Sequence, residues 1–119
     1  MDELLKKLHF GYDGLIRNIN ISGFNSAEIV ISVKDHDLEK WINVRFVINS
    51  LEVFRLLKNR NATNVILSSG IQIKRISGLI YLNLDPRSDE FESLEDLEDS
   101  EVYFAGKTIN YKIELYSEK

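Results

Sequence analysis

The chain lacks cysteine altogether, and this absence excludes several kinds of protein. With no thiol among 119 residues, there is no disulfide framework, no thiolate zinc site and no cysteine nucleophile. Such a composition is typical of a reducing compartment, so we expect a cytoplasmic location. The first residues agree with this expectation, because charges interrupt their leucines where a signal peptide needs an unbroken apolar core.

Long apolar runs are also missing. No stretch approaches the roughly 20 apolar residues that a membrane-spanning helix needs, so we expect no membrane partner. Proline occurs once, as Pro86, and the chain has no internal repeat and no low-complexity linker. A length of 119 residues with 44% hydrophobic residues suits one core, and we expect a single domain over residues 1–119.

What the chain does have is an uneven distribution of charge. Between Asp85 and Glu101, which we call the acidic segment, nine of 17 residues are acidic and the only base is Arg87. The whole chain has 19 acids and 15 bases, so the other 102 residues carry 10 acids and 14 bases. The remainder is therefore positive and the acidic segment strongly negative.

The overall charge indicates which partners to expect. A pI near 5.2 and scattered lysines and arginines argue against nucleic acid, whose affinity comes largely from clustered bases that neutralise phosphates. An acidic surface instead favours a basic protein partner. We therefore predict a protein partner of basic character and no nucleic acid.

Alternating apolar residues predict most of the strands. Leu15, Arg17, Ile19 and Ile21 would share one face of a first strand, Ala27, Ile29, Ile31 and Val33 the inner face of a second, and Ile42, Val44, Phe46 and Ile48 that of a third. Polar turns between them indicate an antiparallel meander. In a last strand, Ile109, Tyr111, Ile113 and Leu115 would face inward.

Turn signals predict two hairpins. Ser77-Gly78 separates the β-rich runs 71–76 and 79–84, and Ala105 to Lys107 separates Val102–Phe104 from Ile109–Tyr116.

Helical signals are fewer. Residues 2–8 place leucines at helical spacing, with acids before lysines. Asn49 followed by Glu52 has the form of a capping box, and a helix would continue to Lys58; a strand through Val53 and Phe54 is the alternative. We expect a loop over residues 60–64. Together these signals predict an α+β class: a mainly antiparallel sheet of six to seven strands with one or two short helices.

The acidic segment is the first candidate site. Phe91, Leu94 and Leu97 recur every three residues, so a short helix would hold them against the domain. The candidate partner-binding carboxylates would then face outward: Glu90, Glu92, Glu95, Asp96, Glu98 and Asp99. The alternative is a solvated connecting loop, which acidic sequence also permits.

Two clusters place a histidine close to carboxylates. Asp35-His36-Asp37 combines residue types that metals use, but it lies in a predicted turn where Asp bonds to nearby backbone, and no third ligand is evident. His9 near Tyr12 and Asp13 has no nucleophile in a recognisable elbow. We therefore predict no catalytic residue, no metal site and no cofactor.

Trp41, Val47 and Tyr116 fall on the polar faces of their strands. The sequence favours helices that cover that face, or a strand register shifted by one residue. Left exposed, the aromatics would form an interaction patch, with Trp41 as a partner-binding residue.

One resemblance covers about the first half of the chain. The run from His9 to Ile19 (HFGYDGLIRNI), the alternating strand after it, and Trp41 leading into Val44-Arg-Phe46 resemble small bacterial β-rich families that include immunity proteins of toxin–immunity pairs. Those families usually have His directly before Asp, whereas three residues separate His9 from Asp13 here. The resemblance implies a non-enzymatic protein that binds and blocks one cognate toxin in the cytoplasm, and it supplies no active-site residues.

Two other functions stay open. One is an assembly domain that forms homo-oligomers through a sheet edge or the aromatic face. The other is a small enzyme or ligand-binding fold whose site gathers scattered residues.

Overall fold

The computed structural model describes residues 2–23, 25–56 and 65–118 and shows an antiparallel sheet with little helix. The strands of this part of the chain are β1 (Leu15–Ser22), β2 (Ser26–Asp35), β3 (Lys40–Leu56), β4 (Val65–Ile66), β5 (Gln72–Ile76), β6 (Leu79–Asn83) and β7 (Val102–Leu115). The helices are α1 (Asp2–Lys7) and two short 3-10 helices, η1 (His9–Gly11) and η2 (Leu94–Leu97). The predicted mainly antiparallel sheet with few helices is confirmed.

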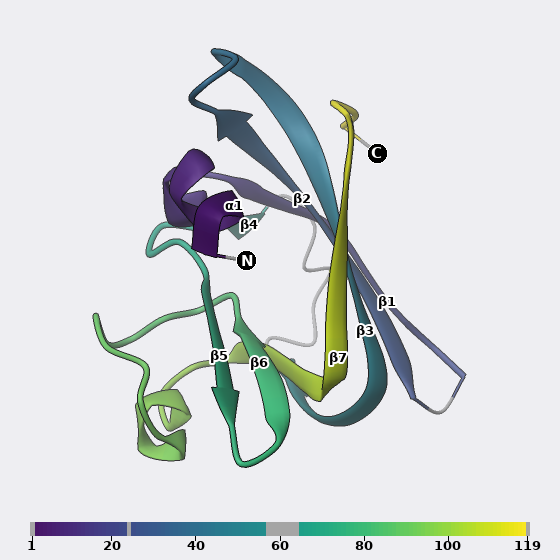
Figure 1. The fold of residues 1–119 in the computed structure, drawn as a ribbon, viewed down its shortest axis with the longest axis vertical. Helices are drawn as coiled ribbons and strands as arrows, with labels where there is room; N and C mark the ends of the chain where they lie inside the picture. Colours follow the sequence, from purple (N-terminus) through teal and green to yellow (C-terminus); the bar gives the residue numbers. More distant parts are fainter. Residues whose placement is uncertain (1, 24, 57–64, 119) are drawn as a thin grey trace.

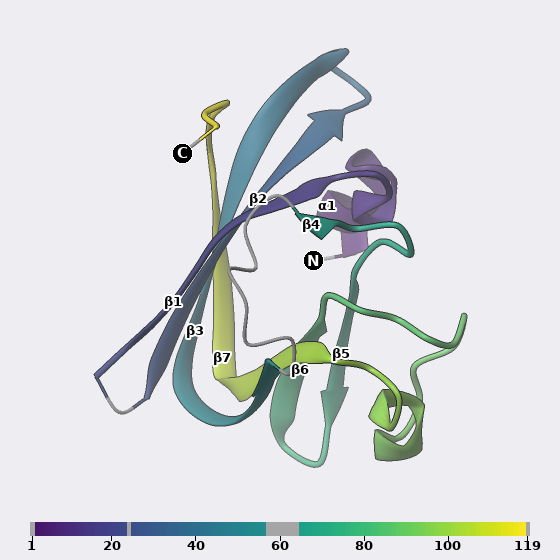
Figure 2. The same cartoon turned by 180° about the vertical axis from the view of Figure 1, so that it is seen from behind.

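The sheet curls over itself because its two longest strands bend. In the order β4-β1-β2-β3-β7-β6-β5, β3 and β7 are the central neighbours. Their upper parts in Figure 1 belong to a layer with β1 and β2, and both turn sharply at the bottom to form a second layer with β6 and β5. The core lies between the two layers, and α1 with η1 lies over the side of the gap that the strands leave open (Figures 1 and 2).

A bulge and a glycine cause the bend. The register between β3 and β7 shifts between Leu51 and Val53, next to Ser50, whose φ is 53°. Opposite this bulge lies Gly106, where an added Cβ would stand 2.6 Å from the carbonyl oxygen of Asn49. Bulges bend a strand, and only glycine permits so close an approach of two backbones.

The face that points into the gap, the inner face, carries the main core. The predicted inward positions of β2 and of the first part of β3 are all buried: Ala27, Ile29, Ile31, Val33, Ile42, Val44, Phe46 and Ile48. Leu4, Leu5 and Leu8 from the first helical turns complete this cluster. The predicted opening helix and both inward patterns are therefore confirmed.

None of the helices among the described residues is long and apolar enough to cross a membrane.

The prediction for β1 was half wrong, because the strand contains a bulge. Ile16 pairs with Ile31, but the next pair is Asn18 with Val30. The extra residue, Arg17, therefore turns outward, and Ile16 is buried in place of the predicted Leu15 and Arg17. Ile19 does lie on the inner face, opposite Ile29.

Two further predictions were wrong for a common reason. The stretch from Asn49 to Leu56 continues β3 instead of forming a helix, because its residues pair with Val102 to Thr108 of β7. Positions 57 and 58 of that predicted helix lie outside the described residues, and so does the predicted loop 60–64. Residues 105–107 form no hairpin turn, since β7 passes through them as the bend at Gly106. The hairpin at Ser77-Gly78 is confirmed as β5–β6.

Candidate functional site

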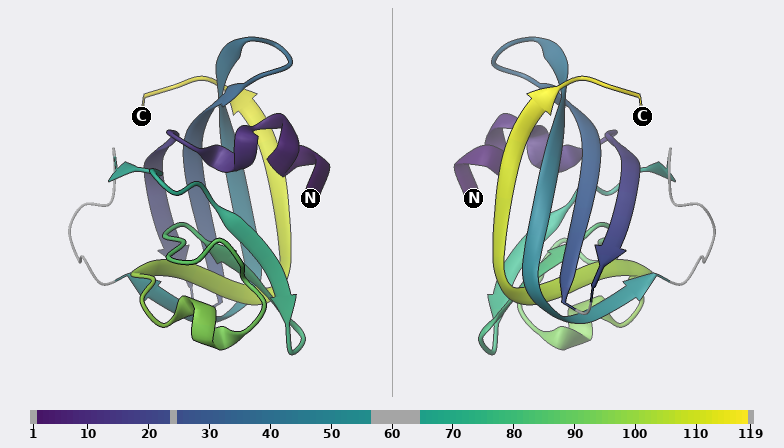
Figure 3. Two further views of the ribbon diagram at one scale, coloured as in Figure 1. Left: turned by 90° about the vertical axis from the view of Figure 1, so that its left-hand side faces the viewer. Right: turned by 90° about the vertical axis from the view of Figure 1, so that its right-hand side faces the viewer.

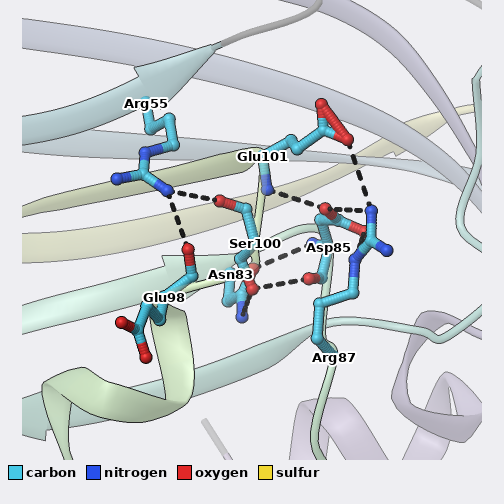
Figure 4. A network of polar contacts seen from close by, with 7 residues as sticks. All are labelled: Arg55, Asn83, Asp85, Arg87, Glu98, Ser100 and Glu101. Carbon is cyan, nitrogen blue, oxygen red and sulfur yellow. Dashed lines mark hydrogen bonds and ion pairs between the residues drawn. The ribbon is translucent and has the colours of Figure 1, made fainter.

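The acidic segment connects β6 to β7, and a network of hydrogen bonds joins its two ends (Figure 4). The Ser100 hydroxyl donates to the backbone oxygen of Asp85 over 2.7 Å and accepts from the Asn83 amide over 3.1 Å. The backbone N–H of Glu101 donates to the Asp85 carboxylate over 2.7 Å. Asn83 and Ser100 are fully buried, so the base of the segment is fixed to the sheet.

Two arginines strengthen this attachment. Arg87 makes two 3.0 Å hydrogen bonds to the Asp85 carboxylate and lies 3.5 Å from that of Glu101. The bonds with Asp85 raise the pKa of Arg87 above its ordinary value. Arg55 of β3 donates to the backbone oxygens of Glu98 and Ser100 over 3.2 Å each (Figure 4). Both arginines hold the segment in place, and the Arg55 bonds go to carbonyl oxygens, not to the Glu98 carboxylate.

Apolar side chains anchor the middle of the segment. Phe91 and Leu97 are buried in a second, smaller cluster with Tyr81 and Ala105. Burial there raises the pKa of the Tyr81 hydroxyl. Leu94, the third apolar residue of the predicted helix, is 52% exposed. In place of the predicted helix, the structure forms one short 3-10 turn at Leu94–Leu97. Of the three predicted apolar anchors, Phe91 and Leu97 are buried and Leu94 is not.

The six candidate carboxylates do not share one role. Glu90, Glu92, Glu95, Glu98 and Asp99 are exposed. Asp96 is half-buried, and one of its oxygens accepts hydrogen bonds from the backbone N–H groups of Glu92 and Ser93, over 2.8 and 3.1 Å. Asp96 therefore shapes the segment, and the other five form a carboxylate surface that faces solvent.

A groove lies beside this carboxylate surface. It measures about 550 Å³ and runs between η2 and the bent parts of β3 and β7. Apolar and aromatic side chains line it, among them Val53, Tyr81, Leu94 and Tyr103. Glu95 and Glu98 also line it, and so does Arg55, whose guanidinium lies over the Tyr103 ring, 5.5 Å from its centroid. An apolar groove with carboxylates at hand suits a long basic side chain, whose stem is apolar and whose head is charged.

A second hollow, of about 700 Å³, lies on another side of the acidic segment. Phe10, Tyr12, Ile71, Phe91 and Arg87 are among its lining residues. One of these lining residues, Phe10, has a positive φ of 55°. The Arg87 guanidinium is already paired with carboxylates, so the hollow offers no unbalanced positive charge to an anion.

The fold brings the two histidine clusters together. Asp35 is buried and accepts hydrogen bonds from the backbone N–H groups of Asp37 and Leu38, over 2.9 and 3.1 Å, as the turn prediction required. His36 stacks on His9, with 3.6 Å between ring centroids. Within the described ranges, His9 makes no hydrogen bond to Asp13, and no three His, Asp or Glu side chains gather as metal ligands would.

Trp41 lies away from the acidic segment. The β2–β3 turn next to it is at the top of Figure 1, whereas η2 is near the bottom. Trp41 is 43% exposed and packs edge-on against Tyr116, 6.4 Å away. The expectation that helices cover this face was wrong, because α1 and η1 pack on the inner face. The structure does not bring Trp41 together with the candidate carboxylates.

Several residues that build the site gave no signal in the sequence. Arg55, Tyr81 and Tyr103 come from three different strands, and only the fold brings them beside the acidic segment. Asn83 lies two residues before the segment and Ser100 is its second-last residue, and no sequence pattern singled out either of them.

We compared the chain with models of known protein families, with curated proteins and with solved structures, and none of the three comparisons gave a match.

Proposed function

We propose that this protein is a cytoplasmic, non-enzymatic binding protein, most specifically an immunity protein that neutralises a basic toxin. The observation that carries the proposal is the attachment of the acidic segment to the sheet. Its base is hydrogen-bonded and its middle is anchored by Phe91 and Leu97, so the backbone that carries the five exposed carboxylates is held in place. A charged surface that is already ordered binds without the entropic cost of ordering a loop.

The charge suits a basic partner. Clustered carboxylates attract a cationic protein over distances of about 8 Å at physiological salt, and so raise the association rate. The groove between η2 and β3 would accept a lysine or arginine side chain, with its stem against Val53 and Leu94 and its head near Glu95 or Glu98. The carboxylates raise the association rate, and the groove makes short-range contacts in the bound complex.

The test compares two variants with the same net charge. In the first, Glu90, Glu92, Glu95 and Glu98 become Gln. In the control, four exposed acids elsewhere, Glu3, Asp13, Asp37 and Glu39, become their amides. The candidate partner to be tested is the product of the adjacent gene, and association is followed over a salt series.

The first variant should associate at least about tenfold more slowly at low salt and lose most of its salt dependence, since rim charges act mainly through the association rate. The control should stay close to the unmodified protein. Equally slowed association of both variants would show that only the net charge of the protein matters. An unchanged association rate in the first variant would show that the acidic segment only connects β6 to β7. Protection of cells that express the adjacent gene product separates an immunity protein from any other binding protein.

A further inference from the structure

One edge of β7 has no strand beside it. The β6 strand pairs with β7 only at residues 103–106, whereas β3 pairs with β7 from Val102 to Leu115. Along residues 108–115, the side of β7 that faces away from β3 therefore has no strand partner in the part of the chain that the structure describes. Figure 3 shows this part of β7 at the margin of the sheet. Its outward N–H and C=O groups are free to pair with another strand.

Apolar side chains at this edge lie on the inner face, beside buried core residues of β3. Tyr111, Ile113 and Leu115 stand opposite Phe46, Val44 and Ile42 in the register of β3 and β7. These β3 residues are buried, yet Tyr111, Ile113 and Leu115 are 45%, 43% and 87% exposed. The apolar inner face thus extends to the open edge without cover.

We infer that a second copy of this chain pairs with this edge, β7 against β7, antiparallel and centred on Ile113. A two-fold axis there sets Ile113 opposite Ile113 of the second copy and Tyr111 opposite its Leu115. The same register sets Lys112 opposite Glu114, twice in each dimer. Apolar side chains then meet on the inner face and opposite charges meet on the outer face, as stable cross-strand pairs require.

The charges select this register over its neighbours. A shift of the axis to position 112 sets Lys112 against Lys112, and a shift to position 114 sets Glu114 against Glu114. Directly opposed like charges are destabilising. An axis at Tyr111 sets Leu115 against Lys107 and pairs no opposite charges. The Ile113 register alone among these matches both faces.

The surroundings of Lys112 and Glu114 agree with this arrangement. Glu114 receives hydrogen bonds from Arg45, over 3.0 and 3.2 Å, which fix its carboxylate on the outer face. Lys112 is exposed and makes no ion pair within the described ranges, so its ammonium is available to the second copy. The acidic segment enters β7 at Val102, the far end from Ile113, and stays accessible in the dimer (Figure 1).

Charge exchange tests the register. Sedimentation equilibrium from micromolar to millimolar protein should show the mass of the unmodified chain doubling. Lys112→Glu alone and Glu114→Lys alone should each weaken dimerisation by about tenfold or more, since each places two like-charge pairs in the dimer. An equimolar mixture of the two variants should dimerise again, because one chain then carries two acids and the other two bases. A mixture that stays monomeric would overturn the register.

A cross-link provides a second test that does not depend on Arg45. Because the chain has no cysteine, Ile113→Cys introduces a single thiol on the two-fold axis, where the Cα atoms of opposed residues lie about 4.5 to 5.5 Å apart, within disulfide reach. Mild oxidation should convert this variant to a covalent dimer. Leu38→Cys, on the exposed β2–β3 turn, is the matched control and should not cross-link at the same rate. Equal rates, or a monomeric unmodified chain over the whole concentration range, would overturn the proposal.

Discussion

The ring of Phe91 packs edge-on against the ring of Tyr81, with 6.1 Å between their centroids and 80° between their planes. Through this contact, the middle of the acidic segment is attached to β6. Aromatic pairs in this geometry contribute about 0.5–1.5 kcal/mol beyond the burial of their area. The order of the carboxylate surface therefore depends on a residue that carries no charge.

Replacing Phe91 with alanine should release the acidic segment while the sheet stays folded. The small cluster around Phe91 is separate from the main core, so local opening is expected to precede global unfolding. Hydrogen exchange at residues 91–100 should accelerate, and the amides of β2 and β3 should stay protected. Leu94→Ala is the control: with its side chain half exposed, it should change stability by less than about 0.5 kcal/mol. Unchanged exchange in Phe91→Ala would contradict the anchoring role.

Replacing Phe46 with alanine should lower the free energy of unfolding by about 3–5 kcal/mol, the usual range for a buried phenylalanine. Phe46 is completely buried on the inner face of β3. Phe54, on the same strand beyond the bulge, is half exposed, and its replacement should have a clearly smaller effect. Denaturant melts give the free energy of unfolding of the two variants. Equal losses of this free energy would show that the burial of the phenylalanine does not determine its contribution to stability.

Gly70→Ala should destabilise the protein more than Gly78→Ala. Both glycines have positive φ, 73° and 86°, so alanine at either position is strained by about 1–2 kcal/mol. A Cβ at Gly70 would also stand 2.5 Å from the backbone oxygen of Phe10, whereas nothing lies within 4 Å of one at Gly78. The difference in the free energy of unfolding between the two variants measures the cost of this close approach. A Gly78→Ala variant less stable than Gly70→Ala would contradict the prediction.

Acid should weaken the fold partly through Asp35. Burial by itself would raise the pKa of Asp35, but hydrogen bonds from the backbone of Leu38 and Asp37 and from Lys7, 3.3 Å away, hold that pKa below its ordinary value of 3.8. Because the folded-state pKa is the lower one, the carboxylate stabilises the fold at neutral pH, and this contribution disappears as the pH falls from about 5 through the folded-state pKa.

Asp35→Asn should therefore make the free energy of unfolding less dependent on pH below about pH 5. Some dependence should persist, because hydrogen bonds with Arg45 also lower the pKa of Glu114. Chemical denaturation at a series of pH values checks this. A variant with the same acid dependence as the unmodified protein would show that Asp35 is not a main source of it.

Local sequence patterns determined the parts of the fold that depend on nearby residues. The alternation in β2 and in the first part of β3 identified their buried positions, from Ala27 to Val33 and from Ile42 to Ile48. Ser77-Gly78 identified a hairpin because its two residues adopt positive φ, which glycine permits at little strain. The turn at Asp35 and the helix at Asp2–Lys7 followed from equally local signals.

Tertiary contacts decided the rest. Asn49 and Glu52 carry a helical capping pattern, yet pairing with β7 keeps this stretch extended, and Gly106 serves as a bend where a turn was expected. Asp96 and its neighbour Glu95 look alike in the sequence, but only Asp96 turns back to the segment's own backbone. Leu115 follows the same alternation as Ile42 and is nevertheless exposed. Alternation identifies which face of a regular strand a residue occupies, although a bulge such as the one at Arg17 shifts it. Burial, bending and charge neighbours depend on segments far away in the chain that only folding brings together.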